Sequence, residues 1–446
     1  MSHVVIVPGS TDLNRGDQAL LWETARVIND ASPGTRVFLI DHGDTDEELE
    51  LQVSQTEAAG YSVLRRILPH PRRGVHVEHD KVRDGGKAKL RMMAWAARDL
   101  AKYSALLRIA DDPRKARKLL DSDQIATYDT ILGAKALVVK GGGFLHSYGE
   151  MSSWYYIWYQ LFYMRLAQKM GIPVIIMPNS FGPFEGFGVK SQIRKVIGGA
   201  DLVYARESVS KSVLDHTLGT STVELSPDLA YHMESGQDRD VMSTLRDAGV
   251  DDSRQTVGLT VRPYRFPGSP DPEGLYEQYV RSMASLAEHA HSKGYHPVFV
   301  AQVSGPSAHE DDRLAIRDVT SRIKDGTKYS VVDDIGLDCY DIESVYGSMN
   351  IVIGTRFHSV IFAQNSRVPS GAIAYGGNKS IGIMGDIGIS DAVIPIESIS
   401  SDSVCEMFDW IVNNDDNVRN RLTEWSDACK INRAKLVSDV SAVISR

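Results

Sequence analysis

Short apolar runs rich in valine, isoleucine and leucine recur along this chain, and stretches with helical periodicity separate them. Such runs are typical of strands buried on both faces, because crossover helices cover both sides of a parallel sheet. One series occupies residues 4–7, 37–40, 136–139, 174–177 and 202–204, and a second occupies residues 256–261, 296–301, 351–353 and 370–374. The alternation predicts an α/β protein with doubly wound parallel sheets.

A polar stretch over residues 234–255 separates the two series of strands. With 446 residues and 42% hydrophobic content, the chain is long enough to bury two cores. We therefore expect two Rossmann-like domains with a central cleft, over residues 1–240 and 241–400. Residues 401–446 are helical in pattern and are expected to pack back on the first domain, and residues 44–130 are expected to form a basic helical insertion within it.

Arg356 and His358 follow the strand predicted at residues 351–353, just after a break at Gly354. In parallel sheets ligands bind beyond the carboxyl ends of the strands, where the N-terminus of the next helix offers unpaired N–H groups to an anion. Arg356 can bind two oxygens of a phosphate or carboxylate, and His358 can transfer a proton near neutral pH. This segment is the clearest indication of an anion site.

Two loops of the first series of strands are also expected beyond the carboxyl ends of their strands, a position equivalent to that of Arg356 in the second series. Asn14 and Asp17 follow the first strand, and Asp17 is either a carboxylate that orients or deprotonates a hydroxyl or the N-cap of the next helix. A glycine run follows the strand at residues 136–139, and it either lets a ligand approach the backbone closely or makes a tight turn; its members are Gly141, Gly142 and Gly143.

Three further polar residues follow strands. Arg206 repeats the position of Arg356, although Glu207 beside it also suggests a plain surface ion pair. Asp228 either caps a short helix or contacts substrate. Lys379 lies in a glycine-rich loop, where it is either a second cation for the same anion or a solvated side chain.

Seven of the ten residues from 154 to 163 are aromatic. At helical spacing, Tyr155, Tyr159, Phe162 and Tyr163 share one face, which predicts that they pack in the core. The remaining aromatic residues exceed what one core stripe needs. Stacking on a sugar or on a partner subunit is the alternative for them.

Residues 65–119 are strongly basic, with 16 Lys and Arg against 6 Asp and Glu. Within this segment, residues 90–103 form an amphipathic helical pattern that mixes cations with Trp95 and methionines. That composition suits peripheral contact with an anionic membrane surface, as would serve a lipid-linked substrate. The alternative is a helix with a solvated basic face.

Composition excludes several classes of function. The net charge of −9 disfavours nucleic acid as a partner. Three scattered cysteines, Cys339, Cys405 and Cys429, argue against a disulfide framework and a zinc cluster. No cluster has metal-ligand spacing, so we expect metal independence and no cofactor. Without a signal peptide or a membrane span, the sequence predicts a cytoplasmic protein, with peripheral contact at the inner face of the membrane. The oligomeric state stays open, a homo-oligomer included.

Taken together, these motifs resemble the polysaccharide pyruvyl transferase family. They occur in that family's order over roughly residues 1–395: Asn14-x-Gly16-Asp17, Gly141-Gly142-Gly143, Arg206-Glu207, Arg356-x-His358 and Tyr375 to Lys379. The Arg-x-His motif is distinctive, and the ordered set is much more specific than any single member. The basic span near residues 44–130 looks longer than the corresponding part of the usual family core, so the resemblance assigns it no role.

The resemblance implies a two-domain fold like that of GT-B glycosyltransferases. It implies phosphoenolpyruvate as donor, two hydroxyls of a saccharide as acceptor, and a cyclic pyruvate ketal as product. The donor site would include Arg356, Arg206 and Lys379, with His358 and Asp17 as catalytic residues. His358 either protonates the methylene carbon or donates a hydrogen bond to the leaving phosphate, and Asp17 is the candidate base.

Two other functions fit the same architecture. A glycosyltransferase that uses a nucleotide sugar would need an acidic ribose ligand after a strand of the second domain, and the sequence shows no clear one. A non-catalytic glycan-binding protein has no need for Arg356, His358 and Arg206 together. An NAD-dependent oxidoreductase is disfavoured because no G-x-G-x-x-G follows the first strand.

Overall fold

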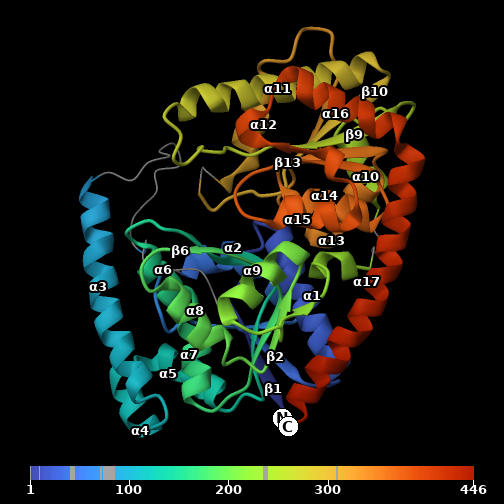
Figure 1. Cartoon of the computed structure of the whole chain (residues 1–446). Coiled ribbons are helices and arrows are strands. Elements are labelled where there is room, and N and C mark those ends of the chain that lie inside the picture. Colours follow the sequence, from blue (N-terminus) through green and yellow to red (C-terminus); the bar gives the residue numbers. More distant parts are fainter. Residues whose placement is uncertain are drawn as a thin grey trace.

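The computed structural model of the chain describes residues 2–9, 11–40, 46–70, 73, 86–234, 240–307 and 310–446. Their elements form two units, each with a parallel sheet between layers of helices (Figure 1). This confirms the expected α/β architecture with doubly wound parallel sheets.

The sheet of the first unit has eight strands in the order β3-β2-β1-β4-β6-β7-β8, with β5 paired to β6. All of these pairs are parallel. The strands are β1 (His3–Val7), β2 (Arg36–Ile40), β3 (Ser62–Leu64), β4 (Leu137–Val139), β5 (Gly142–Tyr148), β6 (Val174–Glu185), β7 (Leu202–Ala205) and β8 (Glu224–Leu225).

The sheet of the second unit has six parallel strands in the order β11-β10-β9-β12-β13-β14 among the residues described. The strands are β9 (Gln255–Thr260), β10 (Tyr295–Val300), β11 (Ser330–Val332), β12 (Ile351–Gly354), β13 (Ser370–Ala374) and β14 (Val393–Pro395).

Helices cover both faces of each sheet. Those of the first unit are α1 (Arg15–Ala31), α2 (Asp46–Ala58), α3 (Gly86–Arg108), α4 (Pro113–Ala116), η1 (Arg117–Leu119), α5 (Ser122–Leu132), α6 (Ser153–Gln160), α7 (Phe162–Lys169), α8 (Val189–Ile197), α9 (Ser208–Leu218) and η2 (Leu229–His232). Those that follow are α10 (Val241–Asp247), α11 (Pro272–Ser292), α12 (Asp312–Thr320), α13 (Cys339–Gly347), α14 (Phe357–Asn365), α15 (Lys379–Ile387), η4 (Ser390–Ala392), η5 (Ile396–Ser398), α16 (Ser401–Asn413) and α17 (Asp415–Ile444).

Strand β1 shows why its sequence folds as a central strand. Successive side chains of a strand point to opposite faces, so Val4 and Ile6 enter the core shared with α1, and Val5 and Val7 enter the core on the other face. All four are at most 3% exposed. A strand buried on both sides needs apolar residues at every position, which explains the continuous run.

In each sheet the strand order reverses at one point, and both points lie where the two units meet. In the first sheet the order turns between β1 and β4, and in the second between β9 and β12. Ligands of open α/β sheets bind at such switch points, beyond the carboxyl ends of the strands. The loops that follow these four strands therefore define where a site should lie.

The last two helices differ in what they cover. Helix α16 packs on α11 of the second unit, whereas α17 runs the length of the molecule and lies against α1 and η2 of the first unit (Figure 1). Both ends of the chain lie at the bottom of the molecule in that view (Figure 1). Among the residues described, no helix is both long and apolar enough to cross a membrane.

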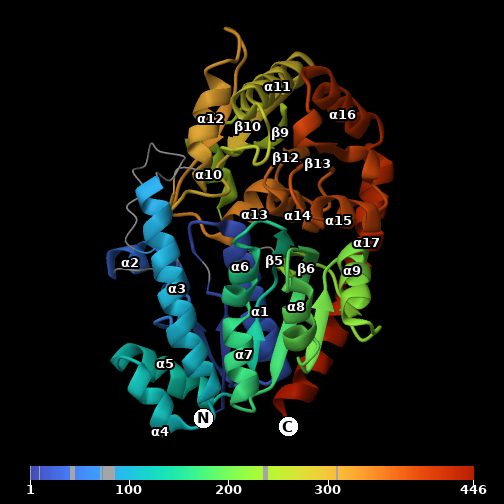
Figure 2. The same ribbon diagram turned by 60° about the vertical axis from the view of Figure 1, so that its left-hand side comes forward.

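The segment expected as a helical insertion also contributes to the sheet. Within residues 44–130, β3 pairs in parallel with β2 and forms the edge of the first sheet. Helix α3 lies on the outside of the first unit (Figures 1 and 2). The expected aromatic helix is interrupted at Leu161, which ends α6 and precedes α7.

Candidate active site between the two sheets

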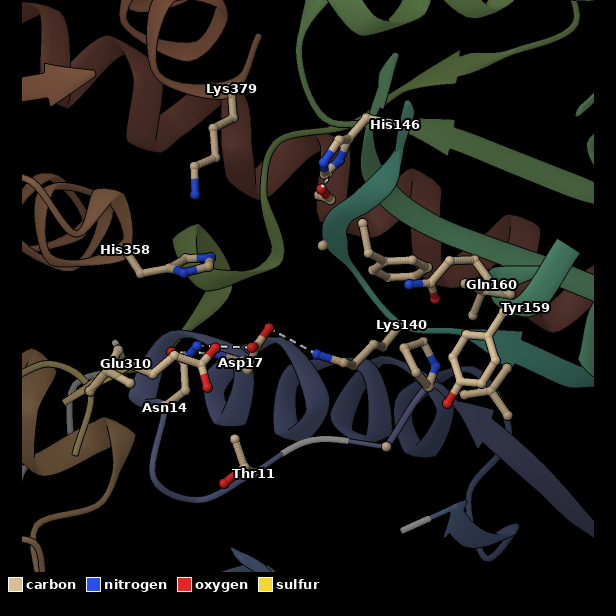
Figure 3. Close-up of a pocket in the computed structure, with 18 of the residues that line it drawn as sticks. Thr11, Asn14, Asp17, Lys140, His146, Tyr159, Gln160, Glu310, His358 and Lys379 are labelled. Carbon is tan, nitrogen blue, oxygen red and sulfur yellow. Dashed lines mark hydrogen bonds and ion pairs between the residues drawn. The ribbon is translucent and has the colours of Figure 1, made fainter. Parts of the chain in front are cut away.

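A cavity of about 550 Å³ lies between the two units, at the switch points of both sheets (Figure 3). Its wall carries six cationic side chains and two carboxylates: Arg66, Lys140, Arg206, Arg262, Arg356 and Lys379, with Asp17 and Glu310. Helices α1, α14 and α15 also direct their N-termini at this region, and a helix N-terminus attracts negative charge. The cavity is therefore suited to a multiply charged anion.

Arg206 lies on the cavity wall and is held by a buried carboxylate. Its Nη1 donates to Oδ2 of Asp228 at 2.6 Å, and its Nε donates to Ser180 Oγ at 2.7 Å. Burial raises the pKa of Asp228, but Arg206 and then His358 outweigh that effect, so the pKa stays below its ordinary value. Asp228 also caps η2 through the N–H of Ala230, so it acts as a cap and as a positioning residue behind the cavity.

The suggestion of a surface ion pair between Arg206 and Glu207 is wrong. The side chains are 1% and 0% exposed, and they lie 3.6 Å apart. Glu207 accepts hydrogen bonds from the hydroxyls of Ser180 and Ser210, and burial raises its pKa. Both charges are thus part of the interior that supports the cavity wall.

Arg356 is held from behind in the same way. Its Nε donates to Oδ1 of Asp312 at 2.8 Å, and its Nη2 also donates to the backbone carbonyl of Glu310 at 3.2 Å. Asp312 is fully buried, and burial raises its pKa above the ordinary value. The guanidinium is therefore oriented before any ligand arrives, which reduces the entropy lost on binding.

His358 reaches across from the second unit toward the first. Its Nε2 lies 3.9 Å from Oδ2 of Asp228 and makes no hydrogen bond within the described part of the chain. Burial lowers the pKa of His358 to about 4, although Asp228 raises it in part. The imidazole is consequently neutral at physiological pH in the unliganded protein, with one nitrogen available to a ligand.

Gly16 makes room for His358. A Cβ placed on Gly16 would overlap Nδ1 and Cγ of the imidazole ring, because the first turn of α1 lies directly against it. A glycine inside a helix costs about 1 kcal/mol relative to alanine, so its presence here has a steric reason. The contact joins the first unit to the second at the centre of the cavity.

Asp17 is not the N-cap of α1, because that position belongs to Asn14, whose side chain accepts from the Asp17 N–H. Oδ2 of Asp17 accepts from Asn14 Nδ2 at 2.9 Å, and Oδ1 accepts from Lys140 Nζ at 3.0 Å (Figure 3). The carboxylate, 40% exposed, faces the cavity below His358. It remains placed to orient or deprotonate a hydroxyl.

The glycine run is the start of a strand rather than a tight turn. Gly142 and Gly143 begin β5 and line the cavity, whereas Gly141 lies behind it, where a Cβ would come 3.1 Å from the carbonyl oxygen of Pro178. A Cβ on Gly143 would lie 2.9 Å from Nη2 of Arg206. The missing side chain therefore leaves space beside that guanidinium.

Lys379 is the first residue of α15 and points into the cavity opposite Asp17 (Figure 3). It is half-buried and lines the cavity, so it is not the fully solvated lysine of the alternative interpretation, and burial lowers its pKa. Its Nζ lies 5.3 Å from the ring centre of Tyr375, and the guanidinium carbon of Arg262 lies 4.2 Å from the same centre. Burial raises the pKa of Tyr375, but the positive charges of Arg262, Lys379 and Arg356 outweigh that effect and bring the pKa down to about 7.

The opposite end of the cavity is aromatic. Tyr156, Tyr159 and Tyr163 line it. The prediction of core packing is confirmed for Phe162, which is fully buried, and Tyr155, Tyr159 and Tyr163 pack partly buried against the same core. Tyr159 and Tyr163 therefore contact both the core and the cavity. Figure 3 shows Tyr159 beside Gln160, on the side away from His358.

Residues Arg66, Leu68 and His70 complete that wall. The backbone N–H of Ile67 donates to the hydroxyl of Tyr163 at 2.8 Å, which fixes this segment on α7. The basic segment therefore contributes to the cavity, a role that the sequence did not indicate.

No group of three or more metal-ligating side chains occurs in the part of the chain that the structure describes. The three cysteines form no disulfide. Metal independence stays a prediction.

Several residues of the cavity were missed by the sequence patterns. Arg262 comes two residues after β9, at a switch-point strand, so the rule that identified Arg356 would have found it. Lys140 directly follows β4 and was passed over in favour of the glycines. His146, with Nδ1 2.9 Å from the carbonyl oxygen of Gly143, gives no signal in the sequence, because only the pairing of β5 with β6 brings it to the cavity.

Comparisons with known proteins identify relatives of this chain. The family model for polysaccharide pyruvyl transferase matches residues 14–377 of this chain. Among curated proteins, the amylovoran biosynthesis protein AmsJ of Erwinia amylovora is 23% identical over 445 residues, covering 98% of both chains.

Two solved structures with similar folds are less than 25% identical to this chain and therefore inform on the fold alone. A putative UDP-N-acetylglucosamine 2-epimerase of Listeria monocytogenes has a TM-score of 0.54 at 9% identity, with 94% of this chain and 90% of that chain covered. UGT2 of Phytolacca americana has a TM-score of 0.52 at 13% identity, with full coverage of both chains. The two-domain GT-B-like architecture is thereby confirmed.

Proposed function

This chain belongs to the polysaccharide pyruvyl transferase family, and from that membership and the geometry of the cavity we propose that it transfers the enolpyruvyl group of phosphoenolpyruvate. The acceptor is a pair of hydroxyls on a glycan or glycan precursor, and the products are a pyruvate ketal and phosphate. The observation that carries the proposal is the cavity wall with six cations, three helix N-termini and a buried histidine. Phosphoenolpyruvate has a phosphate and a carboxylate, and both match forked arginine side chains.

The donor occupies the end of the cavity formed by Arg206, Arg262, Arg356 and Lys379. The acceptor saccharide occupies the aromatic end, because tyrosine rings stack on sugar faces and the Gln160 amide can bond hydroxyls. His358 lies between the two ends with a nitrogen available. In this arrangement the donor carbon that the sugar hydroxyl attacks lies near the imidazole.

His358 donates a proton to the methylene carbon of the donor, which leaves cationic character on the carbon that bears phosphate. One sugar hydroxyl forms a C–O bond to that carbon and loses its proton to Asp17. The C–O bond to phosphate then breaks, the neighbouring hydroxyl attacks the same carbon, and its proton passes to the departing phosphate, which closes the ketal. Lys140, hydrogen-bonded to Asp17, keeps the carboxylate oriented toward the hydroxyl.

The alanine variant of Gly16 tests whether the position of His358 matters. In Gly16→Ala the new methyl group displaces the imidazole, while alanine favours the helix, so phosphate release should fall by at least about tenfold with little change in Tm. Gly385→Ala in α15 is the matched control, since its Cβ meets Ser390 Oγ at an ordinary 3.7 Å. If Gly16→Ala released phosphate at the wild-type rate, the reaction would not depend on the position of the His358 imidazole.

Calorimetric titration of phosphoenolpyruvate tests the proposed function directly. The wild type should bind it, and Lys379→Met should bind it about tenfold to hundredfold more weakly, because one charge-assisted hydrogen bond contributes about 1.5–3 kcal/mol. Arg356→Ala should also lose binding, although it leaves Asp312 unpaired, so Lys379→Met is the cleaner variant.

Lys430→Met is the matched control, since Lys430 is exposed on α17 and pairs with Asp427. UDP-sugars serve as comparators. Binding of a UDP-sugar without binding of phosphoenolpyruvate would contradict the proposal and favour glycosyl transfer.

A further inference from the structure

The N-terminal half of α3 exposes large apolar side chains. Leu90 and Met93 are 68% and 64% exposed. The C-terminal half of α3 packs against the first unit, because Tyr103 and Leu106 are buried in the core of that unit. Figures 1 and 2 both show the helix along the outer side of that unit. The exposed apolar side chains are therefore not explained by packing within the part of the chain that the structure describes.

The exposed positions form one face of the helix. At 3.6 residues per turn, an apolar stripe runs outward along α3, and it consists of Leu90, Met93, Ala94, Ala97 and Ala101. Arg91, Arg98 and Lys102 fall along one flank of that stripe. An outward apolar stripe with a cationic flank is the pattern of a helix that lies in a membrane interface.

The charge around this face is one-sided. Residues 90–120 contain eight Lys and Arg against three Asp, in a chain whose net charge is −9. The one carboxylate between Leu90 and Arg108, that of Asp99, is buried and bonded to Arg73 at 2.5 and 2.9 Å. Between Leu90 and Arg108, the outer face of α3 therefore carries cations and no carboxylate of its own, which is complementary to an anionic surface.

The same helix is tied to the wall of the cavity. Arg73, bound to Asp99, also lies over the ring of Trp95 at 5.1 Å, and Arg91 lies over it at 4.7 Å. Only three positions before Arg73, His70 lines the aromatic end of the cavity and contacts Tyr159 edge to face. A surface held by α3 would therefore lie next to the end that we assign to the acceptor.

We propose that the outer face of α3, centred on Leu90 and Met93, docks on an anionic lipid bilayer and thereby presents the aromatic end of the cavity to saccharides carried on lipid. The role for the acceptor rests on the proposed function, whereas the docking itself does not. A second copy of this chain fits this face less well. Two such faces would bring the cationic flanks of two α3 helices against each other, and like charges repel.

Vesicle sedimentation with the full chain tests the docking. The protein should bind vesicles of phosphatidylcholine with about a third phosphatidylglycerol and not vesicles of phosphatidylcholine alone, and binding should fall as salt rises from about 0.1 M to about 0.5 M. Leu90→Glu should weaken binding about tenfold or more, because it replaces an inserted side chain with a charge repelled by the lipid. Arg98→Glu should weaken it to a similar degree.

Ile431→Glu and Lys430→Glu, both on exposed positions of α17, are the matched controls and should bind vesicles like the wild type. All variants should bind phosphoenolpyruvate normally, so a failure of docking stays separate from a failure of the proposed function. Equal binding to neutral vesicles, or no loss in Leu90→Glu and Arg98→Glu, would overturn the proposal. A dimer that Leu90→Glu dissociates, seen by light scattering without vesicle binding, would assign the face to a second copy instead.

Discussion

Replacing His358 with glutamine is expected to lower the rate of pyruvyl transfer by about 10²–10⁴-fold, the usual contribution of a positioned general acid. Glutamine keeps a polar group of similar reach but cannot donate a proton from a cationic form. The site that surrounds the ring should persist, because Asp228 stays paired with Arg206. Phosphoenolpyruvate should therefore still bind, and the loss should appear in kcat.

The low pKa of His358 adds a requirement to this mechanism. With a pKa of about 4, only about one imidazole in a thousand is protonated at pH 7 in the free protein. Bound phosphoenolpyruvate brings negative charge to the ring, which favours the protonated form and raises the pKa. Donor binding should therefore take up a fraction of a proton in the wild type and not in His358→Gln. Calorimetry in buffers of different ionisation enthalpy measures this uptake.

His232→Gln is the matched control for these measurements. His232 is also buried, its pKa is lowered to about 3, chiefly by burial, and it does not line the cavity. That variant can change stability but should leave kcat and proton uptake unchanged. If His358→Gln still incorporates solvent deuterium into the methyl group at the wild-type rate, the residue is not the proton donor, and a hydrogen bond to the leaving phosphate becomes its role.

Arg206→Leu is expected to destabilise the folded protein by about 3–5 kcal/mol. The side chains of Arg206 and Asp228 are 1% and 0% exposed, and removing one partner of a buried pair leaves an uncompensated charge in the interior. Donor binding should also be lost, because this guanidinium lines the cavity. Thermal unfolding and urea titration of wild type and variant measure the stability.

The double variant Arg206→Leu with Asp228→Asn distinguishes the effect of an unpaired buried carboxylate from the effect of losing the Arg206 side chain. Removing both charges avoids the buried unpaired carboxylate, so the double variant should be more stable than Arg206→Leu alone, and donor binding should stay lost in both. Arg281→Leu is the control, since Arg281 is exposed on the surface and such pairs with Glu277 contribute at most about 1 kcal/mol. An effect of Arg206→Leu no larger than that of Arg281→Leu would contradict the buried-pair interpretation.

The candidate site divides into residues that the sequence could identify and residues that it could not. Arg356, His358, Arg206 and Lys379 each follow a strand and begin or precede a helix, so a local pattern marks them. Arg262 shows only half of that pattern, because it follows β9 but the next helix, α11, begins only at Pro272. His146 and the wall from Arg66 to His70 carry no such pattern.

The sequence by itself determined the two parallel sheets, because short runs rich in Val, Ile and Leu recur and alternate with stretches of helical periodicity, as strands covered on both faces by crossover helices require. It also marked the cationic loops at the ends of those strands. Only the tertiary structure decided that Gly16 lies against His358, that Asp228 is buried behind Arg206 and that the apolar stripe of α3 faces outward. These facts depend on contacts between segments far apart in the chain. A contact between distant segments leaves no periodicity in the sequence, because each residue's type reflects its own burial and not the identity of its partner.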